Sequence, residues 1–510
     1  MNGFDRRTLF RLAAGGSAAL FSVGCASAVE QAREGDGGIA LGILSDLDPK
    51  SIFSQSITSM AIGRLVFDTL TRYDLDTLAP QPLVASGWEI TDGGRSVALT
   101  LRPDVRFHSG RPFTSADVAY SIANLAKDSA GSQLQATAKA VTSVDVSAPH
   151  VAVLTLDHPL PNLFDLFEFM LLTDSQTERE LVAGEAFVGT GPFRFDSWTR
   201  GQQSRWVRNG DYWGGPATIP SVRLVKQGEP LASLWASQTN VVRDVVGNVT
   251  RIFNGNNRFE PIHEGVYDVA YYVGANAKDP YLSNKVVRQA IAYSVDRDRI
   301  AADVFAGNAI AGSTPWSPSS PAFSPSSQQH YRRDLDRARA LLAEAGGPPA
   351  APLLLSYGSG LAAAPTIAAI IQNNLAEVGI PTTIDPREQA AFSSFLKSPT
   401  RQLWINPHGF GQSSPATLAT GAAPFKPVGN LSGFSSPRYT ELVDKLIALP
   451  DPRSAAALEV YGQYTDVLLD EQFVINLVVT DFVTISSSRV SGLSWNLYKY
   501  LVADRVSVRG

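Results

Sequence analysis

Residues 101–118 read LRPDVRFHSGRPFTSADV and join a predicted strand to a predicted helix. Apolar residues alternate with smaller or polar ones up to Leu101, and alternate again over 105–107, as expected of strands with one buried face. Thr114 is followed three residues later by Asp117, the spacing of a helix N-cap and its returning carboxylate. This stretch therefore predicts strand, turn and helix in close succession, with the helix over 114–126.

Regular patterns continue on both sides of this stretch. Apolar residues at helical spacing predict a helix over 60–70, and an Asp-Gly-Gly turn separates strands at 88–90 and 97–101. In the second half, helices and strands alternate, which indicates a βαβ unit in a mixed α/β chain. The remaining expected strands are 38–45, 141–146, 151–156, 353–357, 380–384, 473–477 and 483–485, and the expected helices 284–293, 296–306, 335–345, 363–378, 436–449 and 455–469.

The first 25 residues have the pattern of an export signal. Arg6 and Arg7 precede an Ala- and Gly-rich apolar run over 12–23, which is shorter than the roughly 20 residues needed to span a bilayer. The paired arginines indicate the twin-arginine export route. Cys25 follows the triplet Ser-Val-Gly and is a candidate for lipid attachment after cleavage. The alternative is a simple signal peptide cut near 26–28, which would remove this cysteine.

Length and composition narrow the class of protein. A chain of 510 residues exceeds what one core usually holds, so we expect two or three lobes. The content of 44% hydrophobic and 18% charged residues is ordinary for a folded soluble protein. A net charge of −5 and the lack of a basic run disfavour nucleic acid and a polybasic membrane patch. With one cysteine, no internal disulfide forms, and we expect neither a cofactor nor a metal site.

Further blocks of sequence carry a family pattern: VFDTL at 66–70, PQPLVASGW at 80–88, GTGPF at 189–193, NGDYWGG at 209–215 and VRQAIAYSVDR at 287–297. Together with residues 101–118, and in this order, they resemble extracellular solute-binding proteins of family 5. These are the substrate-binding proteins of peptide/nickel-type ABC importers. The resemblance implies a monomer without catalytic residues that captures a small molecule and delivers it to an ABC permease. It would be periplasmic, or anchored to the outer face of the cytoplasmic membrane through Cys25.

The resemblance also implies an α/β fold of the two-lobed periplasmic-binding-protein type (type II, cluster C). A two-strand hinge joins the lobes, and an extra subdomain extends the first. The implied division is a signal peptide at 1–24, a tether at 25–37, lobe I at 38–68, 185–270 and 486–510, the extra subdomain at 69–184, and lobe II at 271–485.

One loop of lobe II bears on the kind of ligand. Peptide-binding members of the family place a Trp and, three residues later, an Asp that pairs with the peptide α-amino group. The matching positions here hold His408 and Gly411, and no acidic residue occurs between Glu388 and Glu441. A free amino terminus would therefore lack its countercharge in this loop. We expect a neutral, sugar-like, aromatic or anionic ligand rather than an ordinary peptide, with a short peptide as the alternative.

The same loop supplies half of the candidate ligand-binding residues. Trp404, Asn406, His408 and Phe410 alternate, so they would face one side of an extended segment, with Gly409 between the last two. The alternative is that the two aromatic residues are core and the polar pair points to solvent. No second histidine lies near His408, which argues against a metal site.

The other candidates come from three separate segments. Tyr272 and Asn276 lie on a strand that resembles the family's crossing strand, where the alternative is a buried hinge strand. Trp316 lies in a Pro/Ser-rich loop over 315–327 and is either a lid of the cleft or an anchor of the loop. Ser54 and Gln55 follow the first strand and would border the cleft, although a helix-capping role is also open.

Two other classes of function remain open. A secreted hydrolase would need a nucleophile–base or metal constellation, and neither Gly-x-Ser-x-Gly nor His-Glu-x-x-His occurs. A sensor that binds a ligand and signals to a receptor would share the same fold, so the sequence does not separate it from a transport protein.

Overall fold

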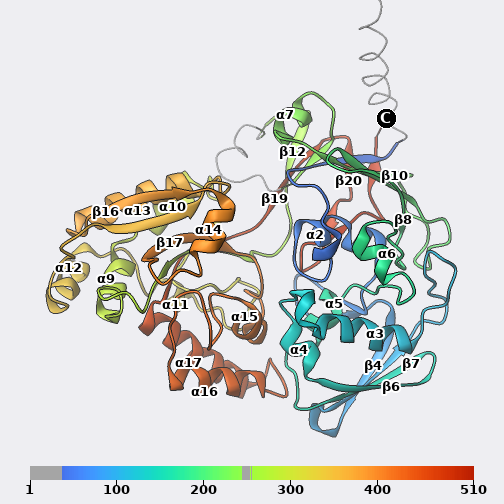
Figure 1. The fold of residues 1–510 in the computed structure, drawn as a ribbon, viewed down its shortest axis with the longest axis horizontal. Helices are drawn as coiled ribbons and strands as arrows, with labels where there is room; N and C mark the ends of the chain where they lie inside the picture. The colour runs from blue at the N-terminus through green and yellow to red at the C-terminus, as the bar shows by residue number, and fades with distance from the viewer. Residues whose placement is uncertain (1–36, 244–252, 254, 510) are drawn as a thin grey trace, which may run out of the picture.

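The computed structural model describes residues 37–243, 253 and 255–509 (Figure 1). The predicted signal peptide, all but the last residue of the predicted tether, and Cys25 lie outside the described residues. Within them, two lobes are built around separate β-sheets, with lobe I on the right of Figure 1 and lobe II on the left. No helix among the described residues is both long enough and apolar enough to cross a membrane.

Lobe I is built on a seven-stranded sheet with the strand order β12-β19-β11-β1-β10-β9-β8. Its centre, β1 (Ile39–Ile43), is entirely buried and pairs in parallel with strands on both sides. This strand is the predicted one at 38–45. The other strands are β8 (Phe193–Thr199), β9 (Gln203–Arg208), β10 (Ser221–Lys226), β11 (Val241–Val242), β12 (Phe259–His263) and β19 (Val483–Ser487).

A four-stranded antiparallel sheet, in the order β4-β5-β7-β6, forms the lower part of lobe I in Figure 1. Its apolar face and the helices beside it belong to the same hydrophobic core as the large sheet, so this subdomain is continuous with lobe I. Its elements are β4 (Ala85–Thr91), β5 (Ser96–Leu101), α3 (Ser115–Ala126), α4 (Gln135–Lys139), β6 (Val141–Ala148), β7 (Val151–Leu156) and α5 (Leu163–Phe169).

Lobe II is built on a six-stranded sheet in the order β14-β18-β13-β17-β15-β16. The strands are β13 (Val269–Ala275), β14 (Ala309–Ala311), β15 (Leu353–Gly358), β16 (Thr382–Arg387), β17 (Leu403–His408) and β18 (Val474–Thr480). β15 and β16 pair in parallel across α13 (Ala364–Glu377), which is the predicted βαβ unit.

Helices cover both faces of this sheet, each with its own core. One face carries α9 (Lys285–Ser294), α10 (Arg297–Asp303), α12 (Leu335–Glu344) and α13. The other carries α15 (Pro415–Gly421), α16 (Pro437–Ile447) and α17 (Ala455–Glu471).

The remaining described elements are short. They are η1 (Pro49–Ser51), α2 (Ile57–Val66), β2 (Thr71–Tyr73), β3 (Pro80–Pro82), η2 (Asp92–Gly94), η3 (Asp128–Ala130), α6 (Glu178–Ala183), α7 (Pro230–Trp235), α11 (Pro325–Gln328), α14 (Gln389–Phe395), β20 (Val490–Ser491), β21 (Ser494–Trp495), β22 (Leu501–Val502) and β23 (Ser507–Val508).

Three of the sequence blocks of lobe I meet at one carboxylate, Asp68. It is completely buried and forms an ion pair with Arg64 at 2.6 Å. It also accepts hydrogen bonds from the Thr190 hydroxyl (3.1 Å), the Tyr212 hydroxyl (3.0 Å) and the Trp213 indole (2.9 Å). A buried carboxylate is stable only when it is paired and hydrogen-bonded. Asp68 therefore explains why VFDTL, GTGPF and NGDYWGG occur together.

The 101–118 stretch joins the same assembly through His108. Its Nε2 lies 3.0 Å from the carbonyl oxygen of Gly191, and the β-carbon of any other residue at Gly189 would lie 2.0 Å from the carbonyl oxygen of Val66. The glycines of GTGPF are thus needed for close backbone approach, not for phosphate binding. Downstream, the predicted capping box is present, because Thr114 and Asp117 hydrogen-bond reciprocally at the start of α3.

The predicted strand at 105–107 was wrong. Only Arg106 pairs, in an isolated bridge to Pro112. Pro112 has no backbone N–H to continue a ladder, so the segment folds as a turn.

The core of lobe II includes one unusually close contact between neighbouring strands. Gly274 on β13 lies opposite Trp404 on β17, and a β-carbon at Gly274 would lie 2.1 Å from the indole ring. The indole therefore occupies the space that a side chain on the neighbouring strand would need.

We predict that Gly274→Ala lowers the melting temperature of the protein, with a cost of about 1–3 kcal/mol typical of an overpacked core. Gly462→Ala is the matched control, because Gly462 lies in α17 with no atom within 4 Å of an added β-carbon. Alanine is the better helix former, so the control should melt at the same temperature or slightly higher. Equal melting of the Gly274→Ala variant and the unaltered protein, measured by calorimetry, would contradict the packing described here.

Candidate functional site

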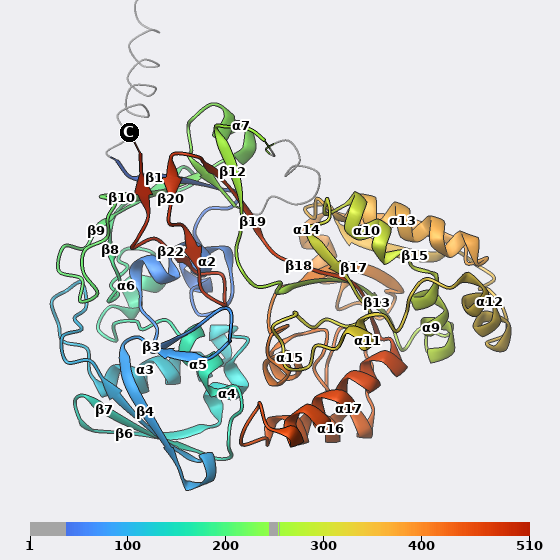
Figure 2. The same ribbon diagram turned by 180° about the vertical axis from the view of Figure 1, so that it is seen from behind.

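Two short segments connect the lobes. The chain passes from β12 to β13 through 264–268 and returns from β18 to β19 through 481–482, as Figure 2 shows from behind. The boundaries predicted at 270/271 and 485/486 fall inside β13 and β19. Both strands are almost fully buried, so burial continues from one lobe into the next along each of them. Paired connections of this kind allow lobes to close around a ligand as on a hinge.

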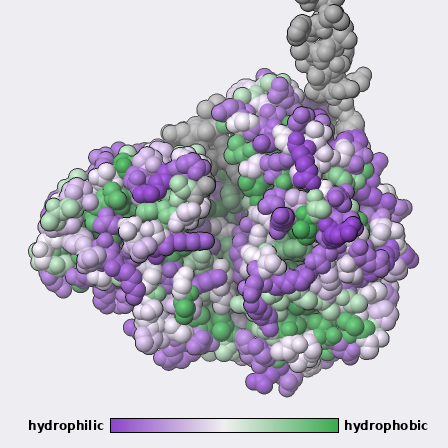
Figure 3. Space-filling view, viewed as in Figure 1, coloured by the Kyte–Doolittle hydropathy of each residue, from purple (hydrophilic) through white to green (hydrophobic). Residues whose placement is uncertain are grey.

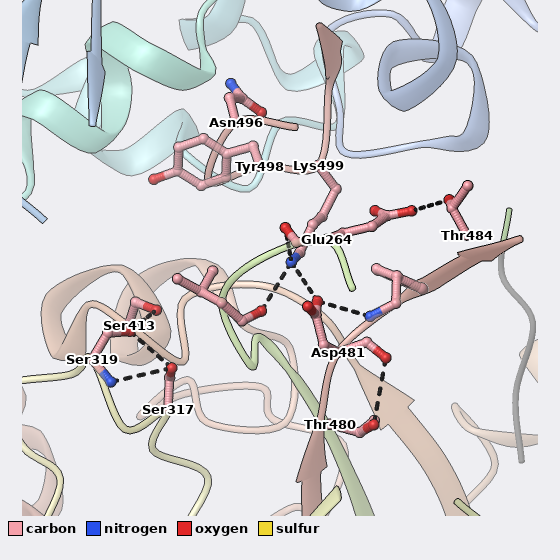
Figure 4. Close-up of polar contacts among 12 residues, drawn as sticks. Glu264, Ser317, Ser319, Ser413, Thr480, Asp481, Thr484, Asn496, Tyr498 and Lys499 are labelled. Carbon is pink, nitrogen blue, oxygen red and sulfur yellow. Dashed lines mark hydrogen bonds and ion pairs between the residues drawn. The ribbon is translucent and has the colours of Figure 1, made fainter. Parts of the chain in front are cut away.

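A buried lysine from the C-terminal tail of lobe I contacts both connecting segments (Figure 4). Lys499 Nζ lies 2.7 Å from Asp481 Oδ1 on the second segment, and both side chains are 1% exposed. The same ammonium donates to the carbonyl oxygens of Val266 (2.9 Å) and Glu264 (3.4 Å) on the first segment. The backbone of Lys499 has φ of 64°, a left-handed conformation that is costly for a residue with a β-carbon. The backbone is therefore strained at Lys499, the residue whose side chain contacts both connecting segments.

A second hinge carboxylate, Asp268, has no such cation of its own. It is 2% exposed, and its Oδ1 has no hydrogen-bond partner within the described part of the chain. Burial raises the pKa of Asp268 to about 7; Lys499 opposes this shift and the charge of Asp481 adds to it.

A cavity of about 190 Å³ lies between the lobes. The molecular surface is hollowed along the same boundary (Figure 3). Lobe I contributes a carboxylate, a phenol and an apolar rim to the cavity, and lobe II contributes hydroxyl groups, prolines, a buried tyrosine and an arginine. The residues used below are Tyr73, Pro161, Asp165, Ser319, Pro321, Ser413, Pro415, Pro452, Arg453 and Tyr461.

The segment after β17 leaves lobe II and packs on lobe I. Phe410 is 2% exposed and belongs to the core of lobe I, with its ring centre 5.7 Å from that of Phe169 and 5.6 Å from that of Tyr498. Thr417 on α15 donates a short hydrogen bond to Asp165 and accepts one from Asn162 at 3.1 Å. The described state is therefore one in which the lobes are in contact.

A second contact crosses the cleft on the other side of the cavity. The Arg453 guanidinium, just before α17, donates from Nη2 to the carbonyl oxygens of Thr77 (2.7 Å) and Leu78 (2.6 Å) of lobe I. These bonds exist only when the lobes lie together.

The predicted residues of β13 and β17 lie side by side, with Tyr272 opposite Asn406. Trp404 and Tyr272 are completely buried in the core with α15–α17, and neither the indole nitrogen nor the phenol oxygen has a hydrogen-bond partner in the described chain. Burial raises the pKa of Tyr272 to about 12, and the neighbouring Asn406 and Trp404 side chains oppose that shift. Asn406 itself is half-buried.

His408 and Gly409 lie where the chain leaves lobe II. His408 Nε2 lies 2.8 Å from the carbonyl oxygen of Phe410, and burial lowers the pKa of the imidazole to about 4. The ring is therefore neutral at pH 7. Gly409 approaches the backbone of Asp268 at the hinge.

The other predicted residues are spread over both lobes. Asn276 donates to the carbonyl oxygens of Pro399 and Arg401, which fixes a loop of lobe II. Trp316 is completely buried, with its indole donating to Thr465 at 2.9 Å. These contacts favour the interpretation of Trp316 as an anchor of its loop.

The early candidates lie in lobe I. Ser54 hydrogen-bonds within its own turn, to the carbonyl oxygen of Ser51. Gln55 donates its side-chain amide to the carbonyl oxygen of Tyr498 at 3.4 Å, beside the ring that contacts Phe410. The structure thus places Gln55 at the boundary between the lobes and Ser54 outside it.

Sequence reasoning missed the polar groups that line the cavity. In the Pro/Ser loop the cavity is lined by Ser319 rather than by the aromatic Trp316: the Ser319 hydroxyl lies 3.4 Å from that of Ser413, and both residues are labelled in Figure 4. Asp165 and Arg453 come from segments without a recognisable motif. Within residues 37–243, 253 and 255–509, no group of three or more His, Cys, Asp or Glu side chains is placed to hold a metal ion.

The sequence profile of the bacterial extracellular solute-binding proteins, family 5 (middle region), matches residues 79–430. The chain belongs to this family. A putative ABC transporter peptide-binding protein of Brucella ovis is similar to this chain, with 29% identity over 340 residues. That match covers 62% of this chain and 63% of the relative, so it spans less than two thirds of the relative's length.

Two solved structures have the same fold as this chain. NikZ from Campylobacter jejuni, in complex with Ni(L-His), superposes with a TM-score of 0.81 at 19% identity, covering 93% of this chain and 100% of that one. AgaA from A. tumefaciens R10, in complex with agropinic acid, superposes with a TM-score of 0.78 at 20% identity, covering 93% and 99%. The predicted two-lobed α/β fold and the predicted family are therefore confirmed.

We predict that Asp268→Asn flattens the pH dependence of stability. The native carboxyl, with a pKa of about 7, binds more protons than the unfolded one, so Asp268 makes the protein less stable as pH rises from about 4 to 7. Asparagine removes that decline. His408 acts in the opposite sense over a similar range but is present in both proteins, so the difference between them isolates Asp268.

The measurement is the melting temperature at pH 4, 5, 6 and 7, with Asp128→Asn as the control because Asp128 is exposed and pairs with exposed Lys139. The gain of the Asp268→Asn variant over the unaltered protein should grow with pH. A gain that is constant over this range would show that Asp268 does not titrate as described.

Proposed function

We propose that this protein captures a small solute between its lobes outside the cytoplasm and delivers it to the permease of an ABC importer. The observation that carries the proposal is the cavity lined by both lobes, set above two hinge segments and bordered by contacts that require closure. A closed cleft excludes water, which strengthens each polar contact to the solute. The names of the Brucella relative and of the two structural neighbours support a binding and transport role.

We further propose that the solute is not an ordinary peptide with a free amino terminus. The loop after β17 has no carboxylate, and a cavity of about 190 Å³ is small beside the 300–1,000 Å³ of typical ligand pockets. Asn406, His408, Gly409 and Gln55 remain proposed contacts on the lobe boundary, while Tyr272 and Phe410 are buried in the cores of lobe II and lobe I and support the residues beside them. Trp404, Trp316, Asn276 and Ser54 act in this proposal as supports of the loops that carry them.

The proposed action is binding alone, by a monomer. The test is a thermal-shift screen of the exported protein with amino acids, short peptides, opines, oligosaccharides, aromatic acids and metal chelates, followed by uptake of the best solute by cells with and without the gene. A solute that binds only the folded state increases the free energy of unfolding by about 2.7 kcal/mol when its concentration is a hundred times its dissociation constant. The melting temperature rises as a result. We expect a shift with one class, recovery of the solute unchanged, and loss of uptake without the gene. Conversion of the solute into a product would contradict the proposal.

Export and anchoring are part of the same proposal. Mature protein would be periplasmic or held at the outer face of the cytoplasmic membrane by a lipid on Cys25, after twin-arginine export of the precursor. We predict that Cys25→Ala releases the protein from the membrane fraction of its native host, while Ser22→Ala does not. Equal membrane retention of Cys25→Ala and the unaltered protein, measured by fractionation, would rule out the lipid anchor.

A further inference from the structure

The cavity between the lobes has a buried carboxyl group on one wall. Asp165 on α5 is 3% exposed and forms no ion pair with a Lys, Arg or His of the described chain. Its oxygens accept hydrogen bonds from the Tyr73 hydroxyl at 2.8 Å and from Thr417. Burial raises the pKa of Asp165, and the surrounding hydroxyl groups oppose that shift. Several hydroxyl donors and no cation thus surround a carboxylate at the cavity wall.

The groups around this carboxylate are neutral. The hydroxyl groups of Tyr73 and Thr417 donate to it and those of Ser414 and Tyr498 lie beside it, and none of them carries the positive charge that an ionised carboxylate would pair with. An uncompensated charge in a low-dielectric site gains more from a cation than the same charge in water. An ammonium group in the cavity would therefore be bound strongly at Asp165.

The opposite charge lies at the edge of the same cavity. Arg453 is exposed, and only its Nη2 is engaged, by the carbonyl oxygens of Thr77 and Leu78. A guanidinium has five N–H donors, and no carboxylate of the described residues forms an ion pair with this one. With Nη2 engaged, the Nε–H and the Nη1 hydrogens remain, and each of these nitrogens can donate a charge-assisted hydrogen bond to a carboxylate oxygen.

Between the two charges the walls are apolar and rigid. Pro161, Pro321, Pro415 and Pro452 line the cavity together with the ring of Tyr461, whose hydroxyl is occupied by the carbonyl oxygen of Pro452 at 3.0 Å. The cavity volume of about 190 Å³ is below the roughly 300–1,000 Å³ of typical ligand pockets. That space suits a small solute of the size of a single amino acid.

We propose that the cavity binds an amino-acid-sized zwitterion, with its ammonium group on Asp165, its carboxylate on Arg453 and an uncharged side chain against the prolines and Tyr461. The inference rests on the proposed solute-binding function and names the class of solute. It replaces the expectation of a neutral, sugar-like, aromatic or anionic ligand, which considered only the loop after β17, and leaves the size of the cavity as the argument against a peptide. The countercharge comes from lobe I, where Asp165 accepts a hydrogen bond from Thr417 on α15, the helix that follows that loop.

The test is isothermal titration calorimetry of the exported protein with each of the twenty L-amino acids. For the tightest binder, two derivatives remove one charge each: the N-acetyl form lacks the ammonium and the amide lacks the carboxylate. We expect at least one amino acid to bind and each derivative to bind at least tenfold more weakly.

Two variants remove the matching charge from the protein. Because both residues also make contacts between the lobes, the ratio of affinities is the readout: in Asp165→Asn the amino acid should lose its at least tenfold advantage over the N-acetyl form, and in Arg453→Gln it should lose its advantage over the amide. Asp128→Asn and Arg299→Gln are the controls, because both residues form exposed ion pairs away from the cavity. This cross-pattern distinguishes direct charge pairing from general damage, which would weaken all three compounds together.

The outcomes separate the two proposals. If a solute binds but no amino acid does, or if the derivatives bind as well as the parent, the zwitterion proposal is overturned while the solute-binding function stands. If no class of solute binds and deletion of the gene leaves uptake unchanged, both proposals fail. If Asp165→Asn does not fold, the comparison of the derivatives on the unaltered protein still decides the matter.

Discussion

The buried ammonium of Lys499 is the contact on which the two-lobed arrangement depends. It is within hydrogen-bonding distance of groups on both connecting segments, Asp481 on one and Val266 on the other. A buried ion pair is weak evidence for extra stability, because desolvation offsets most of the attraction. Its geometric effect is clearer, since removal of either partner would leave a charge buried without compensation. The pair therefore holds both segments against lobe I and leaves lobe II to move about 264–268 and 481–482.

The same short turn connects the hinge to the cleft. Tyr498 precedes Lys499, and its ring contacts Phe410, which lobe II inserts into the core of lobe I. Closure therefore buries an aromatic ring, forms the Thr417–Asp165 hydrogen bond and brings Arg453 against the carbonyl oxygens of Thr77 and Leu78. The cavity lies between these contacts, so a solute that fits it stabilises the closed state by its own interactions. In the proposed function, that coupling would allow a permease to distinguish the loaded protein from the empty one.

Most of the fold could be predicted from the sequence because its signals are local. Apolar periodicity placed the helices and strands of both lobes, and the capping box at Thr114 marked the start of α3. The site was harder to predict. Asp165 and Arg453 are far apart in the chain, have no motif, and meet the same cavity only because the lobes close. An aromatic residue in a polar loop predicts a ligand contact, and Trp316 was a candidate for this reason. Its large apolar side chain is more stable in the core, where it is completely buried. Ser319, three residues later, lines the cavity instead.

The most direct test of this account is the distance between the lobes in solution. Spin labels at Val146→Cys on β6 and Leu458→Cys on α17, both exposed positions, would report it by double electron–electron resonance in a Cys25→Ser background. The account predicts a broad distribution without solute, a single shorter distance with the solute that gives the largest thermal shift, and loss of that narrowing in Lys499→Met. Identical distributions with and without a bound solute would contradict closure as the mode of binding.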